Sequence, residues 1–475
     1  MNKDNLLKIT LIFLVVYLLL DTGYTFYQHS TKALDGDLVA IVLPAERYQA
    51  VMNDPFGFQV LLEDKTYAAP NRFFVHWYIS NYFMTVPKLF QRVVSPAESL
   101  YYASGLSKTA IHVLLITLLA FMVSGARRLW TKEWIIAAVI IAPMFQTGGH
   151  FYKYIGVVDQ SITYSSFYAL PLCLLLLFLI PFQSRFMDKE VKLTIGSKIG
   201  LFLLTLILPF SGPLVPGVVL VIAFLWAIYT LVAFVKTSDF KIFNKLPKTL
   251  VLYFVWITLL SLYSIYIGRN NAENFNWTAL PILERYQRLP IGLYYQLTEK
   301  LAFPLLLLMI FINTYLIRRF DIQKAQMLKL LKWIGLFSLI YLLLLPLGGS
   351  REYRPNILRK DTMLPIILAL IYYYGQTTFL IIRYTDFKYW KGYLVVVMLF
   401  ALIFTYADEP DADQHLCERR YLGEISKSPD SIVKLTNDCT ILSWDIIKDP
   451  KGSADHAQLF KLWNITTADK LFYQE

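Results

Sequence analysis

The sequence predicts an all-α polytopic membrane protein with about 11 transmembrane helices, a large ordered first outer loop and a small α+β C-terminal outer tail. Three observations support this fold class. The 475 residues are 56% hydrophobic and 16% aromatic, which is more apolar surface than a soluble domain can bury. Apolar runs of membrane-spanning length recur along most of the chain. The segments between them alternate between strongly basic and nearly neutral.

The apolar runs set the expected number of helices, judged against a requirement of roughly 17 to 25 residues each. Two runs, 133–147 and 198–211, are short and contain or adjoin proline and glycine. Tilted or re-entrant segments there would place the count between 10 and 12. The full set of runs is 7–22, 108–125, 133–147, 163–183, 198–211, 215–235, 249–267, 301–317, 332–348, 362–382 and 392–407.

The basic residues predict the orientation. With a cytoplasmic N-terminus, the inner segments hold 21 Lys/Arg and 7 Asp/Glu, whereas the outer segments hold 24 and 27. The inner side then carries a formal charge of +14 and the outer side −3, as the positive-inside rule requires. We therefore expect an extracytoplasmic C-terminus. The same distribution accounts for the net charge of +11 without nucleic acid as a partner.

The first residues, MNKDNLLK, lead into an apolar run without a small-residue cleavage site. This pattern favours a retained helix over a removed signal peptide. We recognise no eukaryotic targeting signal in the sequence, so the expected location is a bacterial inner (plasma) membrane.

Two units are expected: a transmembrane bundle over 1–407, which includes an outer loop at 23–107, and a tail over 408–475. The outer loop is too apolar and aromatic for a linker. Within it, residues 80–94 place apolar side chains at helical spacing with Lys88 and Arg92 between them. This pattern predicts either an amphipathic helix along the outer membrane surface or a helix packed on the bundle.

The tail contains short β-branched runs separated by Pro, Asp and Gly, which predict a small α+β cap. Cys417 and Cys439 both lie in it, on the side where an oxidising compartment allows thiols to pair. Their spacing alone leaves the pairing open. Cys173 falls inside a predicted helix, where a small apolar filler is expected.

Candidate chemistry begins with the acidic pair in KALDGDLVAIVLP. Asp35 and Asp37 flank Gly36, which permits unusual dihedral angles between them. Two such carboxylates can hold a hard divalent cation such as Mg²⁺ or Mn²⁺, or one of them can act as a general base. Asp37 is the preferred base, because Asp35 lies closer to Lys32 and can pair with it. The alternative is a solvated turn.

A second candidate is the outer turn LGGSREYRPNILRKDTMLP, at 347–365. The turn carries Arg351, Arg354, Arg359 and Lys360 on the side where topology does not require positive charge. Guanidinium groups suit phosphate through paired charge-assisted hydrogen bonds, so this turn is a candidate clamp for a lipid phosphate or diphosphate. Contacts to lipid headgroups or acidic loops are the alternative. Arg269, Arg285 and Arg288 could extend the basic field.

Several other classes are disfavoured. The sequence contains no Walker loop, G-x-S-x-G, H-E-x-x-H or paired C-x-x-C motif. Few charges lie at the centres of the apolar runs, which argues against an ion-coupled pump. No internal repeat is visible, which weakens a secondary-transporter assignment.

One N-terminal membrane helix, then a large ordered outer loop with an early acidic pair and amphipathic surface helices, resembles the C-type (GT-C) integral-membrane glycosyltransferases. The resemblance covers the whole chain as architecture and one short motif, LDGDL. It implies sugar transfer from a polyprenyl-phosphate donor at the outer face, with Asp35 or Asp37 as base or metal ligand. It also implies polar site residues in the next outer loop, QTGGHFYKYIGVVDQSITY, where His150, Lys153 and Asp159 are candidates.

The leading hypothesis is therefore a membrane glycosyltransferase that moves a sugar from a polyprenyl-phosphate donor to a glycan, lipid or protein acceptor. Asp35 and Asp37 would supply base or metal chemistry, and the arginines would neutralise the leaving phosphate. Two alternatives stay open. A flippase or transporter of lipid-linked glycans would need the arginines but not the acidic pair. A non-catalytic envelope protein would need neither.

Overall fold

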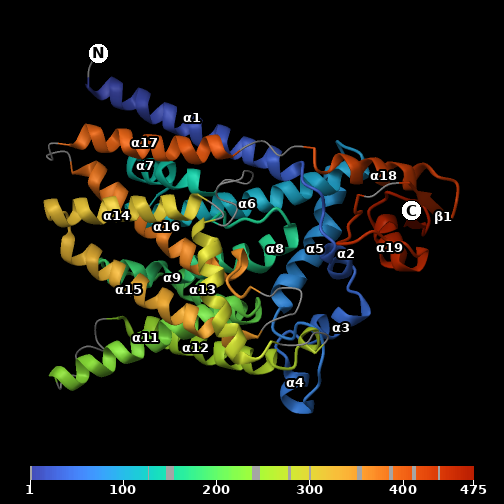
Figure 1. Ribbon diagram of the computed structural model, residues 1–475, viewed down its shortest axis with the longest axis horizontal. Coiled ribbons are helices and arrows are strands. Elements are labelled where there is room, and N and C mark those ends of the chain that lie inside the picture. Colours follow the sequence, from blue (N-terminus) through green and yellow to red (C-terminus); the bar gives the residue numbers. More distant parts are fainter. Residues whose placement is uncertain are drawn as a thin grey trace.

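The structure is a computed structural model in which long apolar helices form a bundle and short elements gather at one end (Figure 1). Nine helices of the described chain are long and apolar enough to cross a membrane. This confirms a multi-pass helical membrane protein, while the count of 11 crossings stays a prediction. The described residues are 3–126, 128–145, 155–237, 246–275, 280–298, 301–349, 356–384, 389–408, 413–436 and 439–475.

The long helices account for nine of the predicted apolar runs. The span at 162–186 is continuous through three segments, α8, η2 and α9. The helices are α1 (Lys3–Ser30), α6 (Pro96–Ser124), α8 (Ile162–Tyr164), η2 (Ser165–Ala169), α9 (Leu170–Phe186), α11 (Leu214–Thr237), α12 (Lys248–Gly268), α14 (Ala302–Phe320), α15 (Lys324–Leu344) with η6 (Leu345–Gly348), α16 (Lys360–Arg383) and α17 (Trp390–Ala407).

The two runs singled out as short are also short helices in the structure. They are α7 (Lys132–Ile141) with η1 (Ala142–Phe145), and α10 (Ile195–Ile207) with η3 (Leu208–Phe210). Proline ends the regular α-helix in both, because Pro143 and Pro209 lack the amide hydrogen that a helix interior uses.

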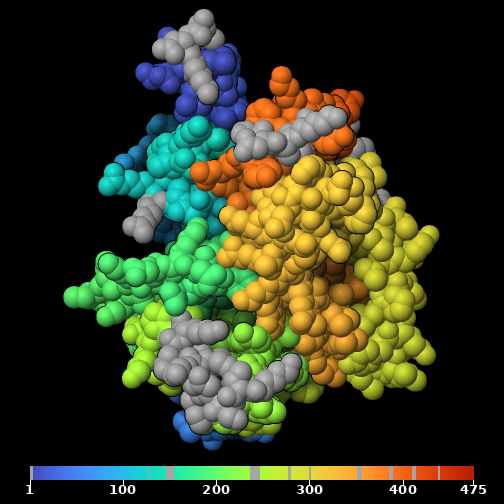
Figure 2. Space-filling model, turned by 90° about the vertical axis from the view of Figure 1, so that its left-hand side faces the viewer, coloured from blue at the N-terminus to red at the C-terminus, as the bar shows by residue number. Residues whose placement is uncertain are grey.

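The helices differ in how deeply they are buried. In α16, 83% of the most apolar window is buried, against 6% in α1. Accordingly, α16 packs against α6, α7, α14, α15 and α17 at the centre of the bundle, whereas α1 runs along its edge against α6 and α7. Figure 2 shows the first turns of α1 standing apart from the other helices at the N-terminal end.

Helix α6 begins well before the apolar run that predicts it. Ser95 caps its first turn by accepting a hydrogen bond from the Glu98 amide, and the Glu98 side chain accepts one from the Ser95 amide in return. Pro96 occupies the first helical turn, where its missing amide hydrogen costs nothing. The helix therefore extends more than two turns further than the sequence analysis placed it, and it includes Lys108 well inside its length.

The first loop folds into four helices at the end of the bundle opposite the N-terminus (Figure 1). We call this the tail end, because the C-terminal tail lies there too. The helices are α2 (Asp37–Val42), α3 (Glu46–Asn53), α4 (Phe58–Glu63) and α5 (Phe73–Phe90). α5 runs across the bundle and packs against α6 and α2, so it is packed on the bundle while Leu89 stays 52% exposed.

A second crossing element is α13 (Ile282–Thr298), which runs across the bundle near the tail-end termini of α14 and α15 (Figure 1). It presents a buried edge at Gly292 and Gln296 and an exposed apolar stripe that includes Leu283 and Tyr294. The turn before it, η5 (Ala272–Asn274), joins the first loop through a backbone bridge between Tyr67 and Asn271.

The tail is a small α+β unit, as the sequence predicts. It consists of α18 (Leu416–Lys427), β1 (Ile432–Leu435), η7 (Pro450–Ser453), α19 (Ala454–Leu462) and β2 (Leu471–Gln474). The two strands pair in parallel, with Ile432 opposite Leu471. Cys417 and Cys439 form a disulfide with their Cα atoms 6.3 Å apart, so the pairing that the sequence left open is present.

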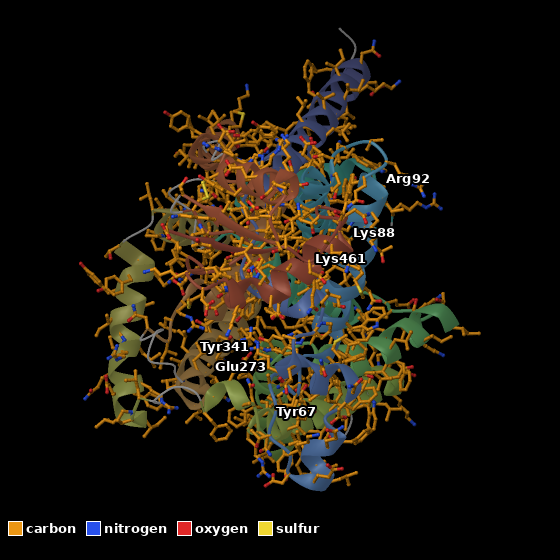
Figure 3. The ribbon with its side chains drawn as sticks, turned by 90° about the vertical axis from the view of Figure 1, so that its right-hand side faces the viewer. Tyr67, Lys88, Arg92, Glu273, Tyr341 and Lys461 are labelled. Atoms are coloured by element: carbon orange, nitrogen blue, oxygen red, sulfur yellow. A yellow bond between two sulfur atoms is a disulfide. The ribbon has the colours of Figure 1, made fainter. Side chains whose placement is uncertain are left out.

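The tail and the first loop share one hydrophobic core. Leu38 and Phe83 of the loop and Leu422 and Phe460 of the tail belong to the same cluster of buried side chains. Trp463 also donates a hydrogen bond from its indole nitrogen to the Phe83 carbonyl, at 2.8 Å. Figure 3 looks onto this end and labels Lys461 of α19, Lys88 of α5 and Arg92, which follows α5. The boundary expected at 407/408 therefore does not separate two independent cores.

Candidate functional site

The turn between α1 and α2 places its two aspartates in different environments. Asp35 is 5% exposed, and its carboxylate accepts hydrogen bonds from Ser161 Oγ at 2.8 Å, Thr163 Oγ1 at 2.8 Å and the Thr163 amide at 3.1 Å. Asp37 instead accepts a hydrogen bond from Trp444 Nε1 of the tail, at 3.1 Å. Asp35 thus faces the interior, and Asp37 faces the tail. The geometry favours Asp35 as the buried base candidate, in contrast to the sequence-based preference.

Gly36 is required for a different reason from the one the sequence suggested. Its φ is −73°, an ordinary helical value that any residue adopts, so the expected unusual dihedral is wrong. A Cβ atom at this position would lie 2.6 Å from the Trp444 amide nitrogen and 2.9 Å from the Ser443 carbonyl carbon. The glycine therefore allows the tail backbone to approach the acidic turn.

Asp35 belongs to a buried set of charged side chains that we call the lysine–aspartate cluster: Lys32, Asp35, Lys108, Asp159 and Lys360. Lys108 is completely buried, and the hydrogen bond described for its ammonium group goes to the Gln160 carbonyl at 2.8 Å. The charges of Lys32, Asp35 and Asp159 all act on it. Three lysines and two aspartates leave one net positive charge.

Four segments build this cluster. Lys32 and Asp35 lie in the turn between α1 and α2, Lys108 lies in α6, Asp159 precedes α8, and Lys360 begins α16. Lys360 Nζ lies 2.9 Å from Asp159 Oδ2, and the two side chains remain 22% and 25% exposed. This ion pair is the more open side of the cluster, whereas Lys32 and Lys108 form its closed side.

His29 adds an unusual feature. Its imidazole is 1% exposed, and neither ring nitrogen has a hydrogen-bond partner within the part of the chain that the structure describes. The nearby titratable groups that act on it are Lys108, His112, Lys32 and Lys360. Buried polar atoms in native proteins are normally hydrogen-bonded. An unpaired imidazole beside three lysines is therefore the kind of site where a bound anion is expected.

The surroundings shift the pKa values of Asp35 and Asp159, the two aspartates of the cluster, in opposite directions. Burial raises the pKa of Asp35 and outweighs the hydrogen bonds from Thr163 and Ser161 that lower it. Burial would also raise the pKa of Asp159, but the Lys360 ammonium overcomes it, so the net shift of that pKa is downward. A raised carboxylate pKa suits a general base, and a lowered one suits a permanent counter-charge.

Of the three arginines predicted to bind phosphate, Arg359 lies in the described part of the chain. Arg351, Arg354 and the predicted site residues His150 and Lys153 lie outside the described residues. Arg359 forms a two-point ion pair with Asp361, at 3.0 and 2.8 Å, which uses its guanidinium locally.

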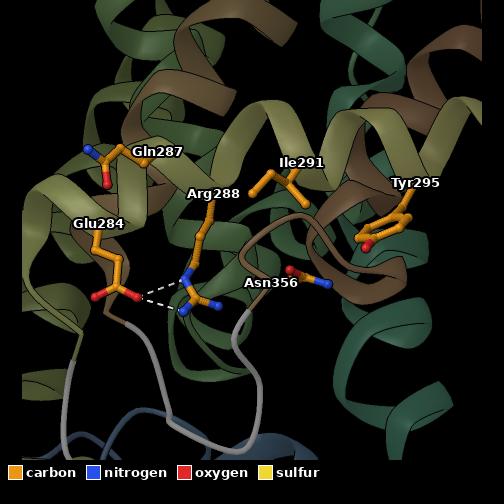
Figure 4. A pocket seen from close by; sticks show the side chains of 6 residues that line it. All are labelled: Glu284, Gln287, Arg288, Ile291, Tyr295 and Asn356. Atoms are coloured by element: carbon orange, nitrogen blue, oxygen red, sulfur yellow. Dashed lines mark hydrogen bonds and ion pairs between the residues drawn. The ribbon is translucent and has the colours of Figure 1, made fainter.

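The other arginines of the basic field are also engaged. Arg269 pairs with Asp64 at 3.2 Å, and Arg285 donates to the carbonyls of Leu280 and Pro346. Arg288 pairs with Glu284 at 2.6 Å in a cavity of about 460 Å³ beside α13 (Figure 4). Figure 4 shows Gln287, Ile291, Tyr295 and Asn356 around this pair. The cavity is a separate polar pocket at the tail end.

Sequence reasoning missed Lys108 and His29 as site residues and named Lys360 only as part of the arginine turn. One signal was available for Lys108. The S-P-A-E sequence at 95–98 is a helix-start pattern, and it places Lys108 near the middle of a membrane helix rather than at its edge. A lysine inside such a helix is costly and marks a candidate site.

Within the described chain, no group of three or more His, Cys, Asp or Glu side chains is placed to hold a metal ion. Both Asp35 oxygens already accept hydrogen bonds from Ser161 or Thr163. No protein-family model, curated protein or solved structure matches this chain.

Proposed function

We propose that this protein is a membrane glycosyltransferase that takes a sugar from a polyprenyl-phosphate donor at the extracytoplasmic face. In this proposal the tail end of the bundle lies outside the cell. The donor phosphate binds at the lysine–aspartate cluster, and Asp35 acts as the general base toward an acceptor hydroxyl.

One observation carries the proposal: a buried carboxylate from the first loop shares a polar cluster with a fully buried membrane-helix lysine. Asp35 and Lys108 come from segments about 70 residues apart, and both are withdrawn from solvent. Charged groups at this depth are expensive and persist where they perform a function. A base beside cations is the arrangement that transfer from a phosphate leaving group requires.

The proposed reaction balances in one displacement. The acceptor oxygen attacks the anomeric carbon of the donor sugar and forms the new glycosidic bond. The bond between that carbon and the phosphate oxygen breaks, and polyprenyl phosphate leaves with the electron pair. Asp35 takes the acceptor proton. Lys108 and Lys360 stabilise the charge that develops on the leaving phosphate.

Two earlier expectations continue as part of this proposal. Arg351 and Arg354 lie a few residues before Lys360 in the sequence, so they are candidates to extend the phosphate site. A divalent cation at Asp35 and Asp37 also stays a prediction. The proposed reaction does not require a metal. Both Asp35 oxygens already accept hydrogen bonds from protein groups, and Asp37 accepts one from Trp444.

The decisive variant is Asp35→Asn, which keeps the shape of the side chain but removes its basicity. Purified protein in liposomes is incubated with a panel of radiolabelled polyprenyl-phosphate hexoses, and released polyprenyl phosphate and transferred sugar are measured. We expect the transfer rate to fall by about 10²- to 10⁴-fold, the usual contribution of a general base. Asp64→Asn, at a side chain of the same outer loop that is 78% exposed, is the matched control and should retain most of the activity.

The alternatives predict other outcomes. If Asp35→Asn transfers sugar at the wild-type rate, the base assignment is wrong. Loss of lipid-linked glycan movement in lysine variants, with full function in Asp35→Asn, would indicate a flippase. Removing 408–475 is not a clean test of a binding-only role, because it would expose the hydrophobic core that the tail shares with the first loop.

A further inference from the structure

Trp444 is an exposed aromatic side chain held directly over the acidic turn. It is 53% exposed, although the tail that carries it is well packed. Its indole N–H donates to Asp37 Oδ1 at 3.1 Å, and its backbone lies against Gly36. The side chain is therefore fixed at the turn rather than free to fold away.

A second aromatic ring lies beside it. The centroid of Tyr164 is 5.8 Å from that of Trp444, with the ring planes at 34°. Tyr164 directly follows Thr163, whose hydroxyl and amide bind Asp35. The aromatic pair is thus tied to both sides of the candidate base: to Asp37 through Trp444, and to Asp35 through the segment that carries Tyr164.

The chemistry of this surface suits a sugar ring. A pyranoside presents apolar C–H faces that stack on an aromatic ring, and hydroxyl groups that donate to carboxylates. The flat faces of Trp444 and Tyr164 provide the first kind of contact, and the Asp37 carboxylate provides the second.

Other ligands fit this surface less well. The Asp37 carboxylate would repel an anionic headgroup. The other large apolar side chains of the tail that are exposed, in the described residues, are Leu416 and Ile432, on different elements from Trp444. Among the described tail residues, no other exposed large apolar side chain therefore lies on the element that carries Trp444.

We propose that Trp444, Tyr164 and Asp37 form a binding site for a sugar ring of the acceptor, which makes the acceptor a glycan or glycoside. This inference rests on the proposed function, because it places the acceptor next to Asp35. It assigns the tail a direct role: Trp444 orients the sugar so that one hydroxyl reaches the base.

The test measures glycoside binding separately from transfer. The full chain is placed in lipid nanodiscs, and methyl pyranosides of glucose, mannose, galactose and N-acetylglucosamine are titrated by saturation-transfer NMR. We expect at least one of them to bind with a dissociation constant in the millimolar range. Trp444→Ala should weaken that binding at least tenfold. Trp77→Ala is the matched control, because Trp77 is 50% exposed on α5, and it should bind as the wild type does.

Two further variants protect the test against unfolding. Trp444→Phe keeps a ring but loses the hydrogen bond to Asp37, so its binding should be intermediate at an unchanged Tm. Asp35→Asn should bind the glycoside normally while losing transfer. The inference is overturned if none of the four glycosides binds the wild type, or if Trp444→Ala and Trp444→Phe both bind as it does. Trp444-dependent binding without any transfer would instead contradict only the proposed function.

Discussion

Two buried polar sites in the bundle differ in how their side chains compensate for the loss of contact with water. At the junction of α14, α16 and α17, the Asn313 amide donates to Thr377 and Thr378, both at 2.9 Å, and accepts from the Tyr393 hydroxyl at 2.8 Å. Every group there is neutral. The lysine–aspartate cluster instead contains a buried lysine and an ion pair at its rim, and its lysines act on the unpaired His29.

The difference separates a structural site from a functional one. A neutral network with matched donors and acceptors holds three helices together and needs nothing more. A charged set with unsatisfied groups is costly in the protein alone and gains its full stabilisation when a ligand supplies the missing contacts. The comparison therefore predicts that changes in the cluster alter binding more than stability, and that changes at Asn313 do the reverse.

The largest effect is expected for Lys108→Met, which removes the buried charge at nearly constant side-chain length. A charge-assisted hydrogen bond contributes about 1.5–3 kcal/mol, so affinity for geranylgeranyl phosphate should fall roughly 10- to 150-fold. Native mass spectrometry of the protein in detergent measures this affinity. Geranylgeraniol, which lacks the phosphate, is the ligand control, and the exposed Lys88→Met is the protein control. Equal affinity of Lys108→Met and wild type would contradict phosphate binding at the cluster.

Glu418 provides an intermediate case, because it is a buried carboxylate whose bonds are all to protein groups. It accepts from the amides of Leu34 and Leu442 and from the Tyr101 hydroxyl, at 3.0, 2.8 and 3.0 Å. Burial raises its pKa from an ordinary 4.5 to about 7. Between these pH values Glu418 keeps a proton in the folded state and releases it in the unfolded state. The contribution of Glu418 to the free energy of unfolding is therefore largest below pH 4.5 and declines as pH rises toward 7.

Glu418→Gln should remove this decline, which amounts to at most about 1.4 kcal/mol per pH unit. The measurement is Tm in detergent from pH 4.5 to 8 for the variant and the wild type. The amide also loses one backbone hydrogen bond, so its Tm should be lower throughout, and only the slope is diagnostic. Glu424→Gln, on the exposed side of the same helix, should keep the wild-type slope. If the Tm of Glu418→Gln and that of the wild type change with pH in parallel, Glu418 does not have a raised pKa in the folded protein.

The smallest effect is expected for Asn313→Leu, which breaks the neutral network. Interhelical hydrogen bonds in membrane proteins contribute about 0.6 kcal/mol on average and up to about 1.7 kcal/mol. The variant should therefore lower the free energy of unfolding by about 1–2 kcal/mol in a denaturant titration. Sugar transfer and lipid-phosphate binding should stay within twofold of wild type. If Asn313→Leu loses lipid-phosphate binding but not stability, Asn313 belongs to a binding site and is not a structural residue.

Much of the fold could be predicted from the sequence. Each predicted apolar run lies on a long or short apolar helix, and both short runs gave short helices, because hydrophobic length and proline act locally. The α+β character of the tail followed from its local composition for the same reason. The predicted start of α6 was wrong, because it was placed at the beginning of the apolar run. The cap formed by Ser95 and Glu98 starts the helix earlier.

The candidate site was predictable only in part. Asp35 stood out as part of a motif, Asp159 was named as a site residue, and Lys360 was named as part of the arginine turn. Their roles could not be predicted, since no local pattern shows that Asp35 turns inward to Thr163 while Asp37 turns outward to Trp444.

What the sequence alone determined is the class of molecule and the course of its helices, because these depend on the hydrophobicity and charge of neighbouring residues. The tertiary structure decided which polar groups meet. It brought Lys108, Asp159 and Lys360 to Asp35 from segments far apart in the chain, and it closed the tail over Gly36, where only a residue without a side chain fits. Such contacts depend on how whole helices pack, and packing is a property of the complete bundle.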